Sequence, residues 1–484
     1  MSDRPPRVLV LATEVVPLPG LPTVGGGLRG WTLARGLAGA GLDVTLVFPR
    51  EPLDALADQL DPVVLAHARR QTFAWADPTA AIREHRPDVV VCCSWFLAAQ
   101  LGDCPVPLAV DLAGPVLLEF LYQDRQQGRD LTPLKPRGLA RADFVTCAGD
   151  RQRAYFYPWL TLAGFDPEAL TTRVATVPIS TAPGVGGDLT APANAEPSIL
   201  FAGIALPWQD PLAALQATLA TLERRGRGVL DLYLYAHPVH SRGVGWLDWL
   251  RDAARTRPRL RLHPERLRPY DELLTIYRGA DLAFDLFARN PERELAFNTR
   301  TVDYLACGLP PLYSDYAELS GPIARYNAGF IVDPADPDAV AAAVGAALDD
   351  PAGLAARRIG ARRLADELLT WDRTIAPLAA WCASPTRRAR PAEGFALAAL
   401  PLVAVAAGEA GARLAAARDE VARWRALAEE RESYALHVEA AWQGLSEAQV
   451  AREAATLAHE RAPWRAAWRR ATGRQRARKS GDGA

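Results

Sequence analysis

The sequence predicts an α/β protein built from two doubly wound parallel sheets, followed by a helical tail. Short apolar runs typical of buried strands alternate with helix-like segments. This alternation stops at a linker of small residues and then restarts, which predicts two sheets rather than one. The tail is predicted because apolar residues recur mostly at steps of three and four over residues 409–460. We place the domains at 1–185, 195–385 and 386–484, with a cleft between the first two.

Composition and charge narrow the classes of protein to which this chain can belong. Of its 484 residues, 49% are hydrophobic and 23% are charged, which excludes a disordered chain, a collagen and a disulfide scaffold. The net charge is −1, so no global attraction to nucleic acid is expected. Residues 461–479 hold eight basic side chains and no acidic one, so the rest of the chain carries −9.

Cysteine spacing and hydropathy predict a cytoplasmic protein. The six cysteines form no Cys-x-x-Cys pair and fall mostly in apolar segments, as expected of reduced thiols. The polar N-terminus does not resemble a signal peptide. The longest uncharged apolar run, residues 395–407, is shorter than the roughly 20 residues that span a bilayer.

The first half begins as a strand, a loop, a helix and a strand. A loop rich in Pro and Gly ends in Gly25, Gly26 and Gly27 and leads into a helix predicted over residues 28–40, which glycines end. Predicted strands cover residues 7–12, 43–48, 87–93, 106–111, 143–147 and 174–178. A second helix is predicted over residues 151–162.

The second half restarts the pattern after a linker at residues 181–197. Its predicted strands cover residues 198–203, 230–235, 260–262, 282–286, 311–313 and 330–332. Its predicted helices cover residues 212–224, 270–278, 300–307, 337–348 and 354–369. Strands that alternate with helices predict a parallel sheet here as well.

Three motifs in these halves carry the functional argument: residues 23–29, 270–281 and 292–310. The last of them ends in Ala-Cys-Gly-Leu-Pro at 306–310. Together they resemble the GT-B glycosyltransferases, which have two Rossmann-like domains. The match is strongest to the retaining family-4 enzymes that use nucleotide sugars. The resemblance covers roughly residues 7–385 and implies a donor site in the second half.

The glycine loop has a direct physical interpretation. Gly25, Gly26 and Gly27 let a backbone approach a diphosphate, and the helix that follows offers free N–H groups and the positive end of its dipole. The resemblance implies that this loop covers the donor diphosphate and sugar. A flexible loop that merely starts a helix remains the simpler alternative.

The third motif predicts further contacts with the donor. The backbone N–H groups of Asn298, Thr299 and Arg300 stand at a predicted helix start and can hold a phosphate, and Arg300 adds a charge-assisted bond. Asp303 stands where the family usually has a glutamate, and its carboxylate can accept two ribose hydroxyl hydrogens. The alternative is an ordinary surface ion pair between Arg300 and Asp303.

The sequence departs from the family pattern at two places. The family carries two glutamates separated by seven residues, but eight separate Glu294 from Asp303, and Leu295 holds the family spacing. The family also follows the glycine equivalent to Gly203 with cations, and none follows here. We therefore expect an altered donor site that includes Gly203. His237 ends a predicted strand and is expected to face the donor.

Asp111 follows a predicted strand, near the place where the family often has a histidine close to the transferring centre. From there it can orient a sugar hydroxyl or help to deprotonate the acceptor, and Glu119 is a second candidate. The simpler interpretation is that Asp111 caps the next turn. We predict Asp111 and Glu294 as the catalytic residues. The remaining histidines lack ligand spacing, so no metal and no cofactor is expected.

The tail combines aromatic and basic residues. Trp464 and Trp468 interleave with arginines, which suits an anionic membrane surface, so we expect a cytoplasmic protein that is peripheral on the inner face of the cell membrane. A solvated basic tail and contact with nucleic acid are the alternatives, and nucleic acid is the less expected. The seam over residues 409–460 predicts self-association as a coiled coil.

Together these features predict a retaining, hexosyltransferase-type glycosyltransferase. It would move a sugar from a nucleotide sugar to a sugar or lipid-linked acceptor, in surface polysaccharide or glycolipid synthesis, by positioning and by stabilising the leaving diphosphate. One alternative is a non-catalytic subunit of the same fold that organises an assembly through its coiled coil, which the two departures favour. A further alternative is a sugar-nucleotide epimerase.

Overall fold

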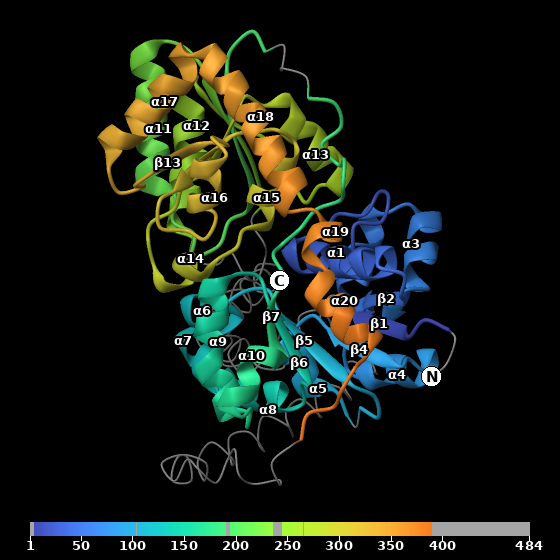
Figure 1. Ribbon diagram of the computed structural model, residues 1–484. Helices are drawn as coiled ribbons and strands as arrows, with labels where there is room; N and C mark the ends of the chain where they lie inside the picture. Colours follow the sequence, from blue (N-terminus) through green and yellow to red (C-terminus); the bar gives the residue numbers. More distant parts are fainter. Residues whose placement is uncertain (1–3, 103, 190–193, 236–243, 265, 390–484) are drawn as a thin grey trace, which may run out of the picture. The chain divides into compact units, whose positions relative to one another are not determined.

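The computed structural model describes most of the chain up to residue 389. The described residues are 4–102, 104–189, 194–235, 244–264 and 266–389. They form two α/β halves, each built on one parallel sheet (Figure 1). The predicted coiled coil at 409–460 and the basic tail with Trp464 and Trp468 lie outside the described residues, and so does His237.

The first sheet has seven parallel strands in the order β3-β2-β1-β4-β5-β6-β7. The strands are β1 (Arg7–Leu11), β2 (Asp43–Pro49), β3 (Thr72–Phe73), β4 (Val89–Cys92), β5 (Leu108–Leu112), β6 (Phe144–Cys147) and β7 (Val174–Thr176). The helices are α1 (Gly25–Gly39), α2 (Arg50–Asp54), α3 (Pro62–Arg69), α4 (Pro78–His85), α5 (Trp95–Gln100), α6 (Val116–Gln123), α7 (Arg125–Leu131), α8 (Leu134–Ala140), α9 (Asp150–Leu162) and α10 (Leu170–Arg173). Every residue of β4, β5 and β6 is buried, which explains why these strands show no polar alternation.

The second sheet has six parallel strands in the order β10-β9-β8-β11-β12-β13. The strands are β8 (Ser198–Ile204), β9 (Val229–Tyr235), β10 (Leu260–Leu262), β11 (Leu282–Asp285), β12 (Pro311–Ser314) and β13 (Phe330–Val332). The helices are α11 (Leu212–Arg225), α12 (Gly245–Thr256), α13 (Tyr270–Gly279), α14 (Pro291–Leu295), α15 (Thr299–Ala306), α16 (Ser320–Arg325), α17 (Pro337–Asp349), α18 (Pro351–Leu368), α19 (Trp371–Thr374) and α20 (Ala376–Ala383). The strand and helix positions agree with the predicted α/β fold class.

Both sheets reverse their strand order once. In the first sheet β1 lies between β2 and β4, and in the second β8 lies between β9 and β11. Ligands of open parallel sheets bind outside the carboxyl ends of the strands at such a reversal. This geometry directs attention to the residues that follow β1, β8 and β11.

Helix α1 begins at Gly25, so the prediction that a loop continues to residue 27 is wrong. The Leu28 N–H already donates to the Val24 carbonyl at 3.0 Å. The N–H donors of the first turn of a helix have no intrahelical acceptors, and Gly26 and Gly27 lie too close to their own loop for any side chain, as described below. The three glycines therefore supply the free N-terminal N–H groups of α1 themselves.

The end of the second half returns to the first half. Ile375, Leu378 and Trp381 pack in the same core as Val8 and Leu33, and α19 and α20 lie against α1 (Figure 1). The predicted second domain at 195–385 therefore includes α19 and α20, although these helices pack in the core of the first half. No sequence pattern marks which half an apolar helix will cover.

The chain crosses between the halves at two neighbouring points. Thr181 and Thr370 form a parallel bridge, in which the Thr181 N–H donates to the Leu369 carbonyl at 2.9 Å and the Trp371 N–H donates to the Thr181 carbonyl at 3.0 Å. The two connections thus run side by side.

Within the described residues, no single helix combines the length and the hydropathy of a membrane span. Helices α17 and α18 meet that test only as a pair that bends by 100°.

Candidate functional site

The start of α1 and the start of α15 meet at the carboxyl edges of the two sheets. A Cβ atom placed on Gly25 would lie 3.3 Å from the Thr299 hydroxyl, and nearby Pro22 and Pro269 form an antiparallel bridge. Gly25 is exposed and Thr299 is half-buried. The structure therefore brings the first and third motifs together, so that the unpaired N–H groups of two helices converge at a place open to solvent.

Gly26 and Gly27 serve the packing of their own loop. A Cβ on Gly26 would lie 2.7 Å from the Thr13 hydroxyl, and one on Gly27 would lie 2.0 Å from the Val15 carbonyl oxygen. These contacts require glycine without any ligand. Of the three predicted donor-binding glycines, Gly25 is the one that faces the second half.

Arg300 occupies the space that Gly203 leaves open. Gly203 has φ +143°, and a Cβ on it would lie 2.5 Å from the Arg300 Nη1. The guanidinium donates to the Ala202 carbonyl at 3.1 Å and to the Gln209 side chain, and it packs over the Phe201 ring at 5.5 Å. A cation thus does stand beside Gly203, but it comes from α15 instead of the loop after β8.

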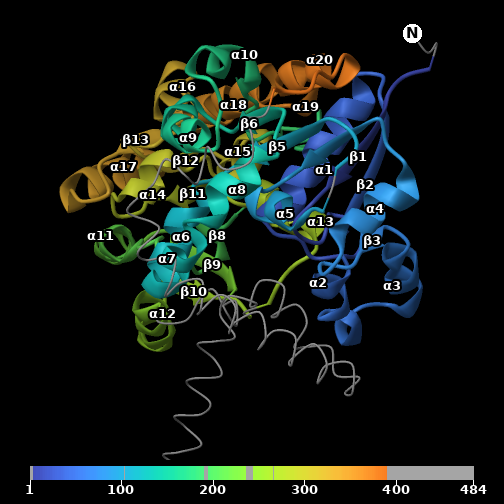
Figure 2. The ribbon, with the colours of Figure 1, turned by 90° about the horizontal axis from the view of Figure 1, so that it is seen from below.

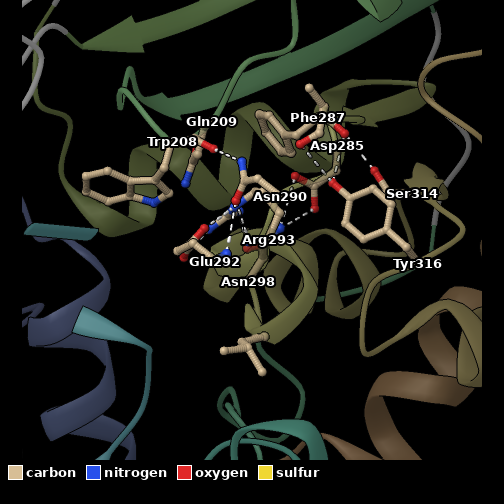
Figure 3. A network of polar contacts seen from close by, with 12 residues as sticks. Trp208, Gln209, Asp285, Phe287, Asn290, Glu292, Arg293, Asn298, Ser314 and Tyr316 are labelled. Carbon is tan, nitrogen blue, oxygen red and sulfur yellow. Dashed lines mark hydrogen bonds and ion pairs between the residues drawn. The ribbon is translucent and has the colours of Figure 1, made fainter. Parts of the chain in front are cut away.

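Asp285 joins three elements from the carboxyl end of β11. Its carboxylate is almost fully buried and accepts from the Asn298 amide at 3.2 Å and from the Thr301 hydroxyl. The Arg300 Nε lies 3.5 Å from its other oxygen. Figure 3 shows this carboxylate beside Asn298. Asp285 therefore holds the start of α15 in place.

A buried ion pair forms the next layer of this network. Glu292 and Arg293 are 2% and 5% exposed at their side chains, and the Arg293 Nη2 donates to the Glu292 Oε1 at 2.7 Å. Burial lowers the pKa of Arg293, but the charge and hydrogen bonds of Glu292, together with the charges of Asp285 and Glu119, outweigh burial and raise the pKa above its ordinary value. Arg293 also donates to the Asn298 side-chain oxygen at 3.0 Å, as Figure 3 shows.

Asn290 fixes α14 and the loop after β8 to each other. Its side-chain oxygen caps α14 by accepting from the Glu292 and Arg293 N–H groups, each at 3.0 Å. Its amide donates to the Trp208 carbonyl at 2.9 Å. The Asn-Pro start of α14 is a capping signal that the sequence carries, and sequence reasoning overlooked it.

Helix α14 also contacts the first half, where it packs against α6 and α9 (Figure 2). Gln152 of α9 donates to the Ala113 carbonyl at 3.1 Å and to the Leu295 carbonyl at 2.8 Å. Its amide thus links the two halves directly beside the Glu292–Arg293 pair.

Glu119 of α6 faces Glu292 across this contact. Burial and, to a smaller extent, the charge of Glu292 raise the pKa of Glu119 to about 8, while Arg293 opposes the shift. A carboxyl group that holds its proton near neutral pH is suited to proton transfer. The sequence named Glu119 only as a second candidate, because its neighbour Glu292 lies 173 residues away in the chain.

Replacing Glu119 with glutamine is expected to flatten the dependence of stability on pH. The folded protein keeps this proton up to about pH 8, whereas the unfolded chain releases it near the ordinary value of 4.5. Stability is therefore lost as the pH rises from 4.5 to 8. We expect urea unfolding to show that the free energy of unfolding of Glu119→Gln, relative to that of the parent protein, is higher at pH 8.5 than at pH 5. An equal difference at both pH values would contradict this, and the exposed Glu168→Gln is the control.

Glu14 is a site residue that sequence reasoning missed. It lies three residues after the end of β1, and its Cγ would lie 3.1 Å from a Cβ on Gly26. Burial raises the pKa of Glu14 to about 8. Its position after the first strand, next to the glycine loop, is the signal that could have identified it.

Asp303 lies one turn into α15 and is 4% exposed. It accepts from the Tyr270 hydroxyl at 2.7 Å. Burial raises the pKa of Asp303 to about 7, although hydrogen bonds from Tyr270 and Thr181 oppose the shift. No ion pair joins it to Arg300 among the described residues, so the surface pair considered as the alternative is absent there. Its contact with ribose stays a prediction.

Replacing Asp303 with alanine is expected to weaken nucleotide binding by about 10- to 100-fold, the value of hydrogen bonds to a charged group. Calorimetric titration with uridine diphosphate measures the effect. Tyr270→Phe is the matched control, since it removes the partner of Asp303 and leaves the carboxylate able to accept from ribose. Unchanged affinity in Asp303→Ala would remove the ribose assignment.

Asp111 is placed in the interior, which favours a structural role over the predicted catalytic one. It is fully buried, and its two oxygens accept from Arg29 at 2.8 and 2.9 Å and from the Thr146 hydroxyl at 2.5 Å. Arg29 also donates to the Val177 and Pro178 carbonyls. Both oxygens are engaged inside the protein and the side chain is not exposed, so this carboxylate does not face a space open to a substrate. These contacts also differ from the alternative interpretation, in which Asp111 caps the next turn.

The other predicted catalytic residue, Glu294, pairs with Arg289 at 2.6 Å and is 40% exposed at its side chain. The catalytic role of Glu294 stays a prediction. Among the described residues, no group of three His, Cys, Asp or Glu side chains could hold a metal ion, and metal independence likewise stays a prediction.

The site as a whole thus gathers Gly25, Thr299, Arg300, Asn298 and Gly203. It adds three residues that sequence reasoning did not assign to it, Glu14, Asp285 and Arg293, together with Glu292, the ion-pair partner of Arg293. Asp285 carries a detectable signal, since it ends a buried strand next to the reversal of the sheet. The burial of Glu292 and Arg293 has no such signal, because adjacent charges usually lie in solvent.

Comparison with known proteins gives matches in structure only. No family model and no curated protein matches the sequence. Sucrose-phosphate synthase from Thermosynechococcus elongatus is 16% identical, with a TM-score of 0.54 over 78% of this chain and 98% of that chain. HepE from Anabaena, in complex with UDP and glucose, is 14% identical, with a TM-score of 0.56 over 78% and 100%. The trehalose-6-phosphate synthase OtsA is 13% identical, with a TM-score of 0.56 over 79% and 100%.

At sequence identities of 13–16%, the structural similarity is evidence for the fold alone. Each of these chains is covered almost entirely, and both sheets take part in a match of this length. The chain therefore has the GT-B fold that its three motifs predicted.

Proposed function

We propose that this protein is a glycosyltransferase that moves a sugar from a nucleotide-sugar donor to a hydroxyl acceptor. The observation that carries the proposal is the approach of Gly25 to Thr299. Two helix N-termini, of α1 and α15, meet there with the Arg300 guanidinium nearby. N-terminal N–H groups and a guanidinium are the groups that hold a diphosphate.

The leaving group of such a donor is a nucleoside diphosphate, whose negative charge grows as the sugar departs. Dipoles and N–H groups that are already oriented toward that charge lower the barrier without rearrangement. The positions of Arg300 against Gly203 and of Asn298 against Asp285 are fixed by buried contacts. The proposal therefore rests on a preorganised anion site at the strand reversal.

Uridine diphosphate is the nucleotide that we propose first, because HepE of similar fold is described in complex with UDP-glucose. Calorimetric titration of the protein with uridine, guanosine and adenosine diphosphates tests this. We expect saturable binding of one of them. An intact fold that binds none of the three would rule out the enzyme.

We further propose that the transfer retains the anomeric configuration and serves surface polysaccharide or glycolipid synthesis, as the resemblance to family-4 enzymes implies. The acceptor hydroxyl must lose a proton in this transfer. Glu119 and Glu14 are the carboxyl groups whose raised pKa values support this step. The anomeric configuration of the product, read by NMR, would reject the retaining mechanism if it were inverted.

A non-catalytic subunit is the second candidate, and one observation favours it. The Arg300 guanidinium already contacts the Ala202 carbonyl, Gln209 and Asp285, so part of its charge is neutralised before any donor arrives. The nucleotide titration separates the candidates, because a scaffold requires no nucleotide.

We also propose that the basic tail binds an anionic membrane, which would bring a lipid-linked acceptor to the enzyme. Removing residues 461–484 is then expected to abolish sedimentation with vesicles that contain phosphatidylglycerol, because eight basic side chains are lost. Vesicles of neutral phosphatidylcholine provide the control. Equal sedimentation of the full and shortened chains would refute the membrane contact.

A further inference from the structure

A cavity of about 830 Å³ lies at the amino-terminal edge of the first sheet. Its walls come from the start of β1, from α4 and from the segments that lead into β4 and β5. The strands are parallel, so this edge lies opposite the one that holds Gly25 and Glu14. Five residues of β1 separate the two edges, a distance of about 16 Å. The cavity is therefore distinct from the proposed donor site.

Three arginines line this cavity: Arg7, Arg83 and Arg86. The one carboxylate among its lining residues is Asp77, which pairs with Arg83 at 2.6 Å. Arg7 lies 3.6 Å from Asp88, a carboxylate that Arg4 already holds through two hydrogen bonds. The walls of the cavity thus carry a net positive charge.

Among these three arginines, Arg86 is the one whose charge is not paired with a carboxylate of the described residues. Over the residues that the structure describes, its side chain makes no hydrogen bond and no ion pair, and Arg86 is exposed. Its backbone N–H caps the end of α4 by donating to the Ile82 carbonyl at 3.0 Å. The guanidinium is therefore free to bind an anion in the cavity.

The backbone of Arg86 adopts a conformation that arginine disfavours. Its φ is 44° and its ψ is 57°, in the left-handed region. Glycine is the usual residue at such a helix end, because a Cβ atom is strained there. Within the described part of the chain, Asn327 with φ 50° is the other non-glycine residue with positive φ, and asparagine tolerates this region better than most. Strain of this kind is typical of functional positions.

The remaining walls of the cavity are mainly apolar. Ile82, Pro87, Pro105 and Val106 line it together with the polar Thr79 and Gln100. A volume within the roughly 300–1,000 Å³ of small-molecule sites, with few polar groups on apolar walls, suits an organic ligand better than a bare ion. Guanidinium groups match phosphate in geometry and charge.

We propose that this cavity binds a small phosphorylated organic molecule, whose phosphate contacts Arg86 and its neighbours Arg7 and Arg83. The apolar walls contact the body of the ligand. The site lies too far from the donor edge for its ligand to take part in transfer, so it acts as a separate binding site for a metabolite of this class.

The test is a calorimetric titration of the full chain with glucose 6-phosphate, with uridine diphosphate present throughout to occupy the donor site. Arg86→Gly removes the guanidinium and relieves the backbone strain, so it is expected to raise the Tm and to weaken binding at least tenfold. Asn327→Gly is the matched control, with a raised Tm and unchanged affinity. Inorganic phosphate is expected to bind more weakly than glucose 6-phosphate.

Three results would overturn the proposal. The first is equal affinity of the Arg86→Gly variant and the parent protein for glucose 6-phosphate. The second is the absence of saturable binding by the parent protein. The third is inorganic phosphate binding as tightly as glucose 6-phosphate, which would leave the apolar walls without a role.

Discussion

Replacing Asp111 with alanine is expected to lower the free energy of unfolding by about 3–5 kcal/mol, the cost of leaving one partner of a buried ion pair alone. The side chains of Arg29 and Asp111 are 2% and 0% exposed. Burial lowers the pKa of Arg29, and Asp111 more than restores it. Without the carboxylate, the Arg29 guanidinium remains in the interior with two carbonyls and no counter-charge. Urea unfolding measures the loss.

Two further variants separate the ion pair from other effects. Asp252→Ala breaks the exposed pair with Arg255, whose side chains are 75% and 76% exposed, and should change stability by less than about 1 kcal/mol. Asp111→Ala combined with Arg29→Met should recover most of the loss, because both charges are then absent. If Asp111→Ala abolished transfer while leaving stability intact, Asp111 would be catalytic after all.

Replacing Arg300 with glutamine is expected to weaken the binding of uridine diphosphate by about 10- to 100-fold, the contribution of hydrogen bonds to a charged group. The Arg300 side chain is 12% exposed and stands over Gly203, and Arg300 belongs to the first turn of α15. Arg300→Lys keeps the charge but loses the planar guanidinium, so its affinity for uridine diphosphate should fall between those of the parent protein and Arg300→Gln. Calorimetry measures all three proteins.

The matched control for Arg300 is Arg289→Gln. Arg289 belongs to the same loop region, but its side chain is 65% exposed and pairs with Glu294. Its loss should leave nucleotide affinity unchanged. If Arg289→Gln weakened binding as much as Arg300→Gln, the effect would come from the overall charge of this face, and the position of Arg300 over Gly203 would not matter.

The sequence was sufficient for the fold, because buried parallel strands have a strong signature. Uninterrupted apolar runs such as Val89–Cys92 are hard to mistake when helices alternate with them. The start of α1 was misplaced by three residues, since glycine disfavours helices. Glycine is required there because a Cβ atom would collide with Thr13 or Val15, which only the folded loop reveals.

The candidate site was only partly predictable. Asn298, Thr299 and Arg300 were found because a helix start is legible in sequence. Arg300 lies 97 residues from Gly203 in the chain, so the absence of a cation after Gly203 predicted an altered donor site. The interaction between Glu119 and Glu292 could not be predicted for the same reason, because the two residues are far apart in the sequence. Spacing along the chain reports neighbours within an element, whereas these contacts depend on how the sheets and helices pack.

The return of α19 and α20 to the first half has a consequence for the order of events during synthesis. The core around Val8 and Leu33 is closed by Ile375, Leu378 and Trp381, which leave the ribosome long after β7. Some 200 residues separate β7 from α19, or about 10–40 s at typical rates of translation. The first half therefore cannot finish folding before the second half has been made, although it comes first in the chain.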